Sequence, residues 1–305
     1  MSTIIIRHDD CLRHDPGAGH PESVQRLQAV MAALEGLDGI EKLPAPLATV
    51  EQITRAHPLE YWNMVQDAEP GEGRVGLDAD TFVNSGSIEA AQRAAGGMCF
   101  AVDQVLAGKA QRAFCAVRPP GHHAEAAIAM GFCLLNNVAI GALQALEHPS
   151  INKVAILDFD VHHGNGTQAI FEANPDVMFI SSHQQPLYPG TGYADETGCG
   201  NVLNLPLAPG DGSAAFREAW RERALPAASR FDPDLVLVSA GFDAHARDPL
   251  AQLELRAADY RWITEEICTL AEDCCAGRVV SVLEGGYDLE ALAASCREHV
   301  SALGC

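Results

Sequence analysis

The amino-acid sequence predicts an α/β protein in which a central, mostly parallel β-sheet carries helices on both faces. Short apolar runs alternate along the chain with longer amphipathic stretches of helical period. The short runs are apolar at nearly every position, as expected for strands buried on both faces. The 305 residues show no linker composition, low-complexity segment or internal repeat. We therefore expect a single domain over residues 1–305.

Six runs of mostly apolar residues are predicted strands, and six amphipathic stretches are predicted helices. The strands are Thr3–Ile6, Ala113–Val117, Val154–Phe159, Val177–Ser181, Leu235–Ser239 and Val279–Leu283. The helices are Pro21–Leu34, Ile88–Leu106, Leu134–Leu146, Ala214–Ala224, Ala257–Ala271 and Leu289–Val300. Because helices separate most of the strands, the connections are crossovers and the strands are predicted to run parallel.

Two irregular segments are too long for ordinary connections. They are Arg118–Gly131 and Gln184–Asn201, and both are rich in Gly, Pro and His. Ligands of an open parallel sheet gather at the carboxyl ends of its strands. We therefore expect function in these segments and in the residues that follow each strand.

The composition excludes several classes of protein. A net charge of −21 argues against a nucleic-acid partner, because phosphates are held by clustered Lys and Arg. No apolar stretch approaches the ~20 residues of a membrane span, and residues 1–7 do not resemble a secretion signal. The ten cysteines include no Cys-x-x-Cys pair, so we expect reduced thiols and a cytoplasmic location. The oligomeric state stays open, with a homodimer as one option.

Three polar residues stand at alternate positions from the end of the predicted strand Val154–Phe159 onward. In an extended chain, Asp158, Asp160 and His162 would lie on one face. Carboxylate and imidazole groups this close can bind one Zn²⁺ at roughly 2.0–2.2 Å. The alternative is a hydrogen-bonded polar strand end, but two buried carboxylates side by side are costly without a cation.

A third candidate ligand, Asp243, follows the predicted strand Leu235–Ser239. It would emerge at the same edge of the sheet as Asp160 and His162. Three protein ligands with room for a water molecule are typical of catalytic rather than structural zinc.

Two further motifs carry residues suited to acid–base chemistry. His122 and His123 follow a Pro-Gly turn, and imidazole titrates near neutrality. Tyr287 follows the paired glycines Gly285 and Gly286, where its phenol could donate a hydrogen bond to a developing oxyanion. Taken alone, the histidine pair is more often a surface feature, and the tyrosine is more often a packing residue.

Together these motifs resemble the arginase/deacetylase superfamily and, within it, the class II-like histone deacetylases and their bacterial zinc-dependent relatives. The resemblance covers nearly the whole chain. Its segments are His20–Glu22 with Arg26, Leu77–Thr81, Arg118–Asn136, Asp158–Gln168, Pro189–Gly192, Ser239–Asp243 and Glu284–Asp288. It implies an arginase/deacetylase-like fold with about eight strands, one zinc-dependent deacetylase domain and hydrolysis of an acylated amine by metal-activated water.

The resemblance assigns catalytic roles by position. Asp160, His162 and Asp243 would bind one catalytic Zn²⁺ per chain, and Tyr287 would polarise the substrate carbonyl. His123 would act as general base and acid beside His122. Asp158 resembles the carboxylate that orients His122, whereas Asn165 stands where some members carry Asp opposite His123. Because an amide carries no charge, we expect His123 to be less basic than it would be beside a carboxylate.

The resemblance also implies a substrate tunnel. Phe132 and Tyr188 resemble its two aromatic walls, and Gly131 would accept a hydrogen bond from the substrate amide. Leu250 occupies the place where polyamine-selective relatives carry an acidic residue. The expected substrate is an acyl-lysine peptide or protein, or another acylated small amine, with acetylpolyamine as the alternative.

A structural potassium ion is a further implication of the resemblance. Its ligands would come from the following residues: Asp158, Asp160, His162, Ser181 and Ser182.

Two other functions stay open. An arginase-like hydrolase with two manganese ions would need more carboxylates, but Gly164 and His245 stand where that family would be expected to place Asp. A silent module that only binds acyl-lysine would be indicated by a missing tyrosine or metal ligand, and none is missing.

Overall fold

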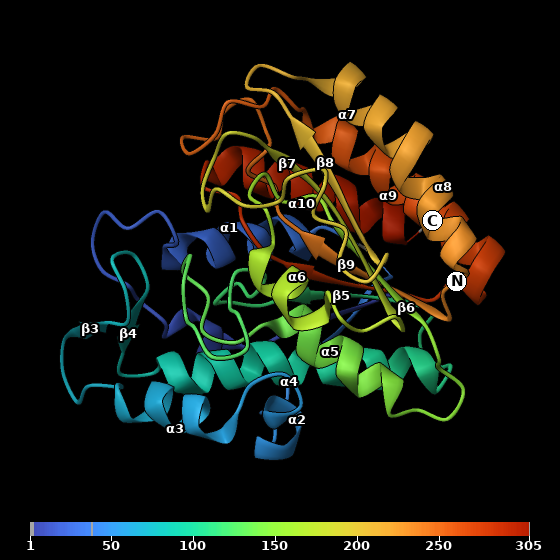
Figure 1. Ribbon diagram of the computed structural model, residues 1–305. Helices are drawn as coiled ribbons and strands as arrows, with labels where there is room; N and C mark the ends of the chain where they lie inside the picture. Colours follow the sequence, from blue (N-terminus) through green and yellow to red (C-terminus); the bar gives the residue numbers. More distant parts are fainter. Residues whose placement is uncertain (1–2, 38, 305) are drawn as a thin grey trace.

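The computed structural model contains an eight-stranded sheet in which every neighbouring pair of strands is parallel (Figure 1). The structure describes residues 3–37 and 39–304. The strand order is β2-β1-β5-β10-β9-β6-β7-β8. The strands are β1 Thr3–Arg7, β2 Glu41–Pro44, β5 Arg112–Ala116, β6 Val154–Asp158, β7 Val177–Gln184, β8 Val202–Leu207, β9 Leu235–Ala240 and β10 Val279–Leu283. The predicted α/β fold with a parallel sheet of about eight strands is confirmed.

All six predicted strands are present, and the two that sequence reasoning missed are the edge strands. β2 contains Glu41, Lys42 and Pro44, and is half-buried or exposed throughout. β8 contains Asn204 and Pro206 among its apolar residues. Proline cannot donate to a ladder and is tolerated at a sheet edge, so neither segment has the composition of a central strand. A separate antiparallel hairpin pairs β3 Arg74–Gly76 with β4 Phe82–Asn84.

The six predicted helices are also present, together with shorter ones. The observed helices are the 3-10 turn Asp9–Leu12, α1 Val24–Glu35, α2 Val50–Thr54, α3 Leu59–Asp67, α4 Ser87–Leu106, α5 Asn137–Leu146, α6 Asn165–Phe171, α7 Ser213–Ala219, α8 Leu225–Phe231, α9 Ala257–Cys275 and α10 Leu289–Leu303. The stretch predicted as one helix over Ala214–Ala224 begins as α7. It then passes through a π-helical turn, Trp220–Ala224, into α8.

Helices cover both faces of the sheet. Figure 1 shows α4 and α5 below the sheet, with α1, α9 and α10 above it. Helices α4 and α5 pack on each other, as do α9 and α10, and α1 packs on α10. This sandwich leaves the carboxyl ends of the strands and the loops that follow them as the place where polar side chains can converge.

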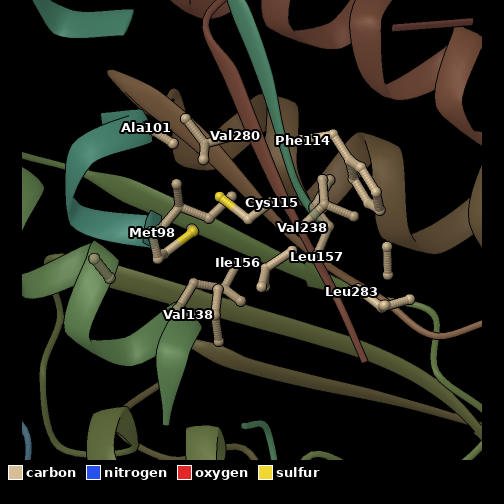
Figure 2. Close-up of a cluster of buried hydrophobic side chains, with 14 of the residues drawn as sticks. Met98, Ala101, Phe114, Cys115, Val138, Ile156, Leu157, Val238, Val280 and Leu283 are labelled. Carbon is tan, nitrogen blue, oxygen red and sulfur yellow. The ribbon is translucent and has the colours of Figure 1, made fainter. Parts of the chain in front are cut away.

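The core below the sheet is close-packed and apolar. Figure 2 shows Met98 of α4 and Val138 of α5 facing Ile156 of β6, whereas the next residue, Leu157, points to the other face of the sheet. These four side chains have no exposed surface. Fully burying a side chain of this size contributes roughly 1.5–3 kcal/mol. The central strands are therefore firmly held where their ends carry the site.

The cysteines fit the expectation of reduced thiols. The nine cysteines in the described part of the chain are free, and seven of them are buried. Cys305 lies outside the described residues. No helix of the described chain is long and apolar enough to cross a membrane.

Helix α10 follows the Tyr287 loop directly and is attached to the sheet by a buried histidine. His299 Nδ1 lies 2.6 Å from Thr264 Oγ1 of α9, and its Nε2 lies 2.8 Å from Ser281 Oγ of β10. The Thr264 hydroxyl donates to the Tyr260 carbonyl, so it accepts from Nδ1–H of a neutral imidazole. Burial lowers the pKa of His299 from 6.5 to about 3.

This arrangement predicts a pH-dependent loss of stability. The unfolded chain binds a proton at His299 below pH 6.5, whereas the folded chain does not until about pH 3. His299 therefore opposes folding increasingly as the pH falls through that window. Between pH 7 and 4.5, wild type should lose roughly 2–3 kcal/mol more unfolding free energy than His299→Gln. Urea unfolding at both pH values measures this, and parallel pH dependences would contradict the assignment.

Candidate functional site

The candidate site lies at the carboxyl ends of four adjacent central strands, β5, β10, β9 and β6. The loop after β5 carries His122 and His123, and the loop after β10 carries Tyr287. Asp243 follows β9, and Asp160 and His162 follow β6. These segments are far apart in sequence. Parallel pairing of the four strands brings their ends to one edge.

Three of these side chains form a compact group suited to a metal ion. His162 Nδ1 lies 3.1 Å from Asp160 Oδ1 and 3.2 Å from Asp243 Oδ2. Asp160, His162 and Asp243 each offer one ligand atom, and these atoms all lie within 4.8 Å of one another. Asp243 Oδ2 is buried and accepts no hydrogen bond from any described residue. A buried carboxylate oxygen without a donor is a suitable ligand for a cation.

The orientation of these ligands comes from a chain of short-range hydrogen bonds rather than from a strand. The strand predicted over Val154–Phe159 is observed, but the chain was wrongly expected to stay extended to His162, because β6 ends at Asp158. Asp158 Oδ1 accepts the N–H of Asp160, and Asp160 Oδ1 accepts the N–H of His162. Asp243 Oδ1 accepts the N–H of Val161 at 2.9 Å. Side-chain caps thus replace sheet pairing once the chain leaves the strand.

Electrostatics in the group favour a bound positive charge. Burial opposes protonation of His162, but the neighbouring carboxylates of Asp160 and Asp243 raise its pKa to about 10. Burial also raises the pKa of Asp243, and the Asp160 charge adds to that effect. His162 Nδ1 therefore stands between two carboxylates that would hold either a proton or a metal ion.

The two adjacent histidines have different partners and opposite pKa shifts. His122 Nδ1 lies 3.0 Å from Asp158 Oδ2. Although burial opposes it, the charges of Asp160 and Asp158 raise the pKa of His122 to about 10. Burial and the neighbouring His122 hold the pKa of His123 well below 6.5. His122 is therefore cationic at neutral pH and His123 is neutral.

The tautomer of His123 follows from its partner, Asn165. The Asn165 amide group donates to Glu125 Oε1 at 2.9 Å, so its carbonyl oxygen faces His123. His123 Nδ1 lies 2.8 Å from this oxygen and donates to it. Nε2 of His123 is then left as a proton acceptor.

An apolar pocket of about 210 Å³ opens next to these groups. His123, His162 and Tyr287 contribute to its walls. Tyr188, which is 38% exposed, reaches solvent. The four residues predicted to bind substrate, Gly131, Phe132, Tyr188 and Leu250, all line the pocket.

Gly131 lies where no other residue would fit. Its φ of 55° is left-handed, and a Cβ there would stand 2.4 Å from the His123 ring. The Phe132 ring meets Tyr287 edge-on at 5.9 Å, and the Tyr188 ring meets His123 at 5.2 Å. The pocket therefore ends against the histidines and the tyrosine.

The proposed potassium ligands also lie together. Asp158 pairs with Ser181 in the β6–β7 register, and Ser182 is the next residue of β7. Ser181 Oγ is 2.9 Å from His183 Nδ1, and Ser182 Oγ accepts from Trp220 Nε1. Among the described residues, no hydrogen-bond donor reaches the main-chain carbonyl oxygens of Asp160 and His162. Buried carbonyl oxygens left in this way are suitable ligands for a hard cation.

Gly164 and His245, which stand where a two-manganese hydrolase would be expected to carry Asp, are not placed to bind a second metal ion. A Cβ on Gly164 would lie 2.4 Å from Asp158 Oδ2, which leaves no space for a carboxylate. His245 Nδ1 accepts the N–H of Arg247, and its main chain bridges to Leu255. Neither residue belongs to the three-residue metal group.

Three side chains that shape the site lie in segments of the resemblance, but sequence reasoning gave them no role. Glu284 Oε2 accepts the N–H groups of Gly121 and His122, and burial raises its pKa to about 7. Arg26 was noted only as part of the resemblance, yet its buried guanidinium donates to the carbonyls of Glu284 and Gly286. Asp80 lines the pocket. Glu284 directly follows a predicted strand, and that position could have indicated its role. No local sequence signal indicates the roles of Arg26 and Asp80.

The arrangement has the chemical parts of a metal-assisted hydrolase. It combines a cation-attracting group, a neutral imidazole with a free acceptor nitrogen, and a phenol around one end of an apolar pocket.

Comparison with known proteins agrees with this description. The histone deacetylase domain model matches residues 20–303. A protein of Archaeoglobus fulgidus named probable deacetylase is 40% identical over 299 residues, covering 95% of this chain and 82% of that one. The histone deacetylase-like amidohydrolase of Pseudomonas aeruginosa is 41% identical over 282 residues, covering 88% and 73%.

A solved structure matches the fold closely as well. The crystal structure of the HDA15 HD domain superposes with a TM-score of 0.93 at 38% identity. The match covers all of this chain and 89% of the other. Sequence, fold and site geometry agree, and this chain belongs to the histone deacetylase family of hydrolases.

Proposed function

We propose that this protein is a zinc-dependent deacetylase that removes acetyl or related acyl groups from lysine side chains. The observation that carries the proposal is the compact group of Asp160, His162 and Asp243 at the inner end of an apolar pocket. The pocket suits an aliphatic chain, and the group stands where the acyl carbonyl of that chain would arrive.

The donor set fits one zinc ion. Two carboxylates and one imidazole are ligands that zinc accepts, and three protein ligands leave a position for water or substrate. Asp243 Oδ2, a buried oxygen that accepts no hydrogen bond from the described residues, supports this assignment. When bound, the ion supplies a Lewis acid that polarises the acyl carbonyl and acidifies a water molecule.

The protein's own groups move the protons. Neutral His123 accepts the proton of the attacking water at Nε2 and then delivers it to the leaving amine. Cationic His122, held by Asp158, adds positive charge where negative charge develops. The Tyr287 hydroxyl donates to the same oxyanion, because burial raises its pKa well above 10 and keeps it protonated.

The walls of the pocket support a lysine-like substrate. Phe132 and Tyr188 would contact the aliphatic stem, and the Gly131 carbonyl would accept from the substrate amide. Leu250 offers no charge to a second ammonium, which favours acyl-lysine over an acetylpolyamine. A structural potassium ion belongs to the same proposal, supported by the carbonyl oxygens of Asp160 and His162 and by Ser181 and Ser182.

The alternatives are less well supported. A two-manganese hydrolase would need ligands that Gly164 and His245 do not provide. A silent acyl-lysine module would not need both a basic imidazole and a phenol beside the ligand group.

The metal assignment predicts one zinc per chain. Asp243→Asn keeps the oxygen that accepts from Val161 but removes the charge, so it should lose metal and activity while staying folded. Elemental analysis and circular dichroism measure this, with Asp259→Asn as a buried carboxylate control remote from the group. Two manganese ions per active chain would overturn the proposal.

The proposed role of Tyr287 predicts a defect confined to the chemical step. Tyr287→Phe removes only the hydroxyl, so zinc content and fold should be unchanged. The kcat for an acetyl-lysine peptide should fall by about 10²–10³, the range for losing one oxyanion donor. An unaltered kcat would remove Tyr287 from the mechanism.

The neutral pocket wall predicts substrate preference. Wild type should hydrolyse acetyl-lysine peptides at least as well as acetylspermidine at physiological salt. Leu250→Glu should shift the kcat/KM ratio toward the polyamine by about fivefold, which corresponds to about 1 kcal/mol of charge attraction. Leu250→Gln is the matched neutral control. A wild-type enzyme that strongly prefers acetylpolyamine would place selectivity elsewhere, with Asp80 the acidic residue in the pocket wall.

A further inference from the structure

Asp248 is a buried carboxylate outside the metal group that joins two walls of the pocket. It is 8% exposed. Its Oδ1 accepts the N–H of Leu250 at 3.0 Å, and its Oδ2 accepts the N–H of Tyr287 at 2.8 Å. No ion pair to Asp248 is present within residues 3–37 and 39–304. Its two oxygens are thus committed to two backbone positions that belong to different loops.

The Tyr287 loop depends on side chains for its backbone contacts. Asp160 Oδ2 accepts the N–H of Gly285 at 2.8 Å, and Arg26 donates to the Gly286 carbonyl at 2.6 Å. Gly286 has a φ of 123°, a backbone conformation that glycine adopts readily and other residues rarely adopt. Tyr287 comes directly after this glycine, whose backbone is less restricted than that of other residues. Its own N–H has Asp248 as acceptor, so this bond fixes the peptide that carries the phenol.

The Leu250 side of Asp248 is a local turn. An Asp side chain that accepts the N–H two residues ahead closes an Asx turn, which sets the path of the chain through Pro249. Leu250 lines the same pocket as Tyr287 and His123. The direction of the Leu250 side chain therefore depends on the same carboxylate as the Tyr287 peptide.

We propose that Asp248 is a positioning residue that fixes Tyr287 and Leu250 relative to each other, so that one carboxylate sets both the oxyanion donor and the amine-selective wall. This inference rests on the proposed deacetylase function. It deepens that function by linking rate and selectivity. Asp248 itself touches neither substrate nor metal in this role.

The proposal predicts a split in kinetic constants. Asp248→Ala removes both acceptors, so the Tyr287 hydroxyl should be misplaced. The kcat for an acetyl-lysine peptide should fall about 10- to 100-fold, the scale of a 1 Å misplacement. The isosteric Asp248→Asn keeps one acceptor oxygen and turns an amide N–H₂ toward the other donor, so its loss should be intermediate. Zinc content should stay at the wild-type value in both variants.

A double-mutant cycle separates positioning from general structural damage. If Asp248 acts on rate through the Tyr287 hydroxyl, Asp248→Ala should lower kcat by no more than about threefold in a Tyr287→Phe background. Likewise, Asp248→Ala should change the ratio of acetyl-lysine to acetylspermidine hydrolysis in wild type but not in a Leu250→Ala background. Multiplicative losses in both backgrounds would overturn the inference.

A matched control accounts for the removal of a buried carboxylate in itself. Asp259 is buried, caps α9 and accepts from Arg217 and Ser213 away from the pocket. Asp259→Asn should lower the melting temperature without altering kcat or the substrate ratio. If Asp248→Asn behaves in the same way, Asp248 is only structural and the inference fails.

Failure of this inference is distinguishable from failure of the proposed function. If Tyr287→Phe is slow but Asp248→Ala has the wild-type kcat and substrate ratio, only the positioning role is lost. If wild type with its zinc hydrolyses neither acyl-lysine nor acetylpolyamine, the proposed function itself is wrong.

Discussion

The arrangement of the site depends on keeping ionisable groups buried at the carboxyl edge of the sheet. Asp158, Asp160 and Asp243 have no exposed surface. An unpaired buried charge is costly, so each carboxylate must find donors. The donors come from different loops: His122 for Asp158, Gly285 for Asp160 and Val161 for Asp243. Satisfying these charges thus ties together the loops that follow four strands and leaves one oxygen of Asp243 for a cation.

The same constraint explains why neighbouring histidines differ in charge. His122 and His123 share a backbone segment and are both buried. A carboxylate faces His122, whereas the amide of Asn165 faces His123. Burial alone lowers an imidazole pKa, and only an ionised partner reverses this. The different partners of the two histidines therefore supply a positive charge and a neutral base side by side. Acid–base chemistry near a cation requires this combination.

The secondary-structure elements that could be predicted from the sequence are those whose residues carry a clear local pattern. The central strands and long helices were predicted because continuous apolar runs and helical periodicity reflect burial directly. The edge strands β2 and β8 were missed because they carry Pro, Asn or charged residues, as edge strands commonly do. The chain was wrongly expected to stay extended past Asp158, because polar and apolar residues continue to alternate there. In the structure, the carboxylates of Asp158 and Asp160 accept main-chain N–H groups two residues ahead and turn the chain.

The sequence by itself determined the fold class, the residues that gather at the strand ends and, through resemblance, the family. These depend on residue type and spacing along the chain. Only the tertiary structure decided which groups meet. It placed β10 and β9 between β5 and β6, directed Glu284 to the His122 backbone, and joined Asp248 to Tyr287 across 39 residues. Such contacts depend on strand order and loop path, which local patterns do not encode.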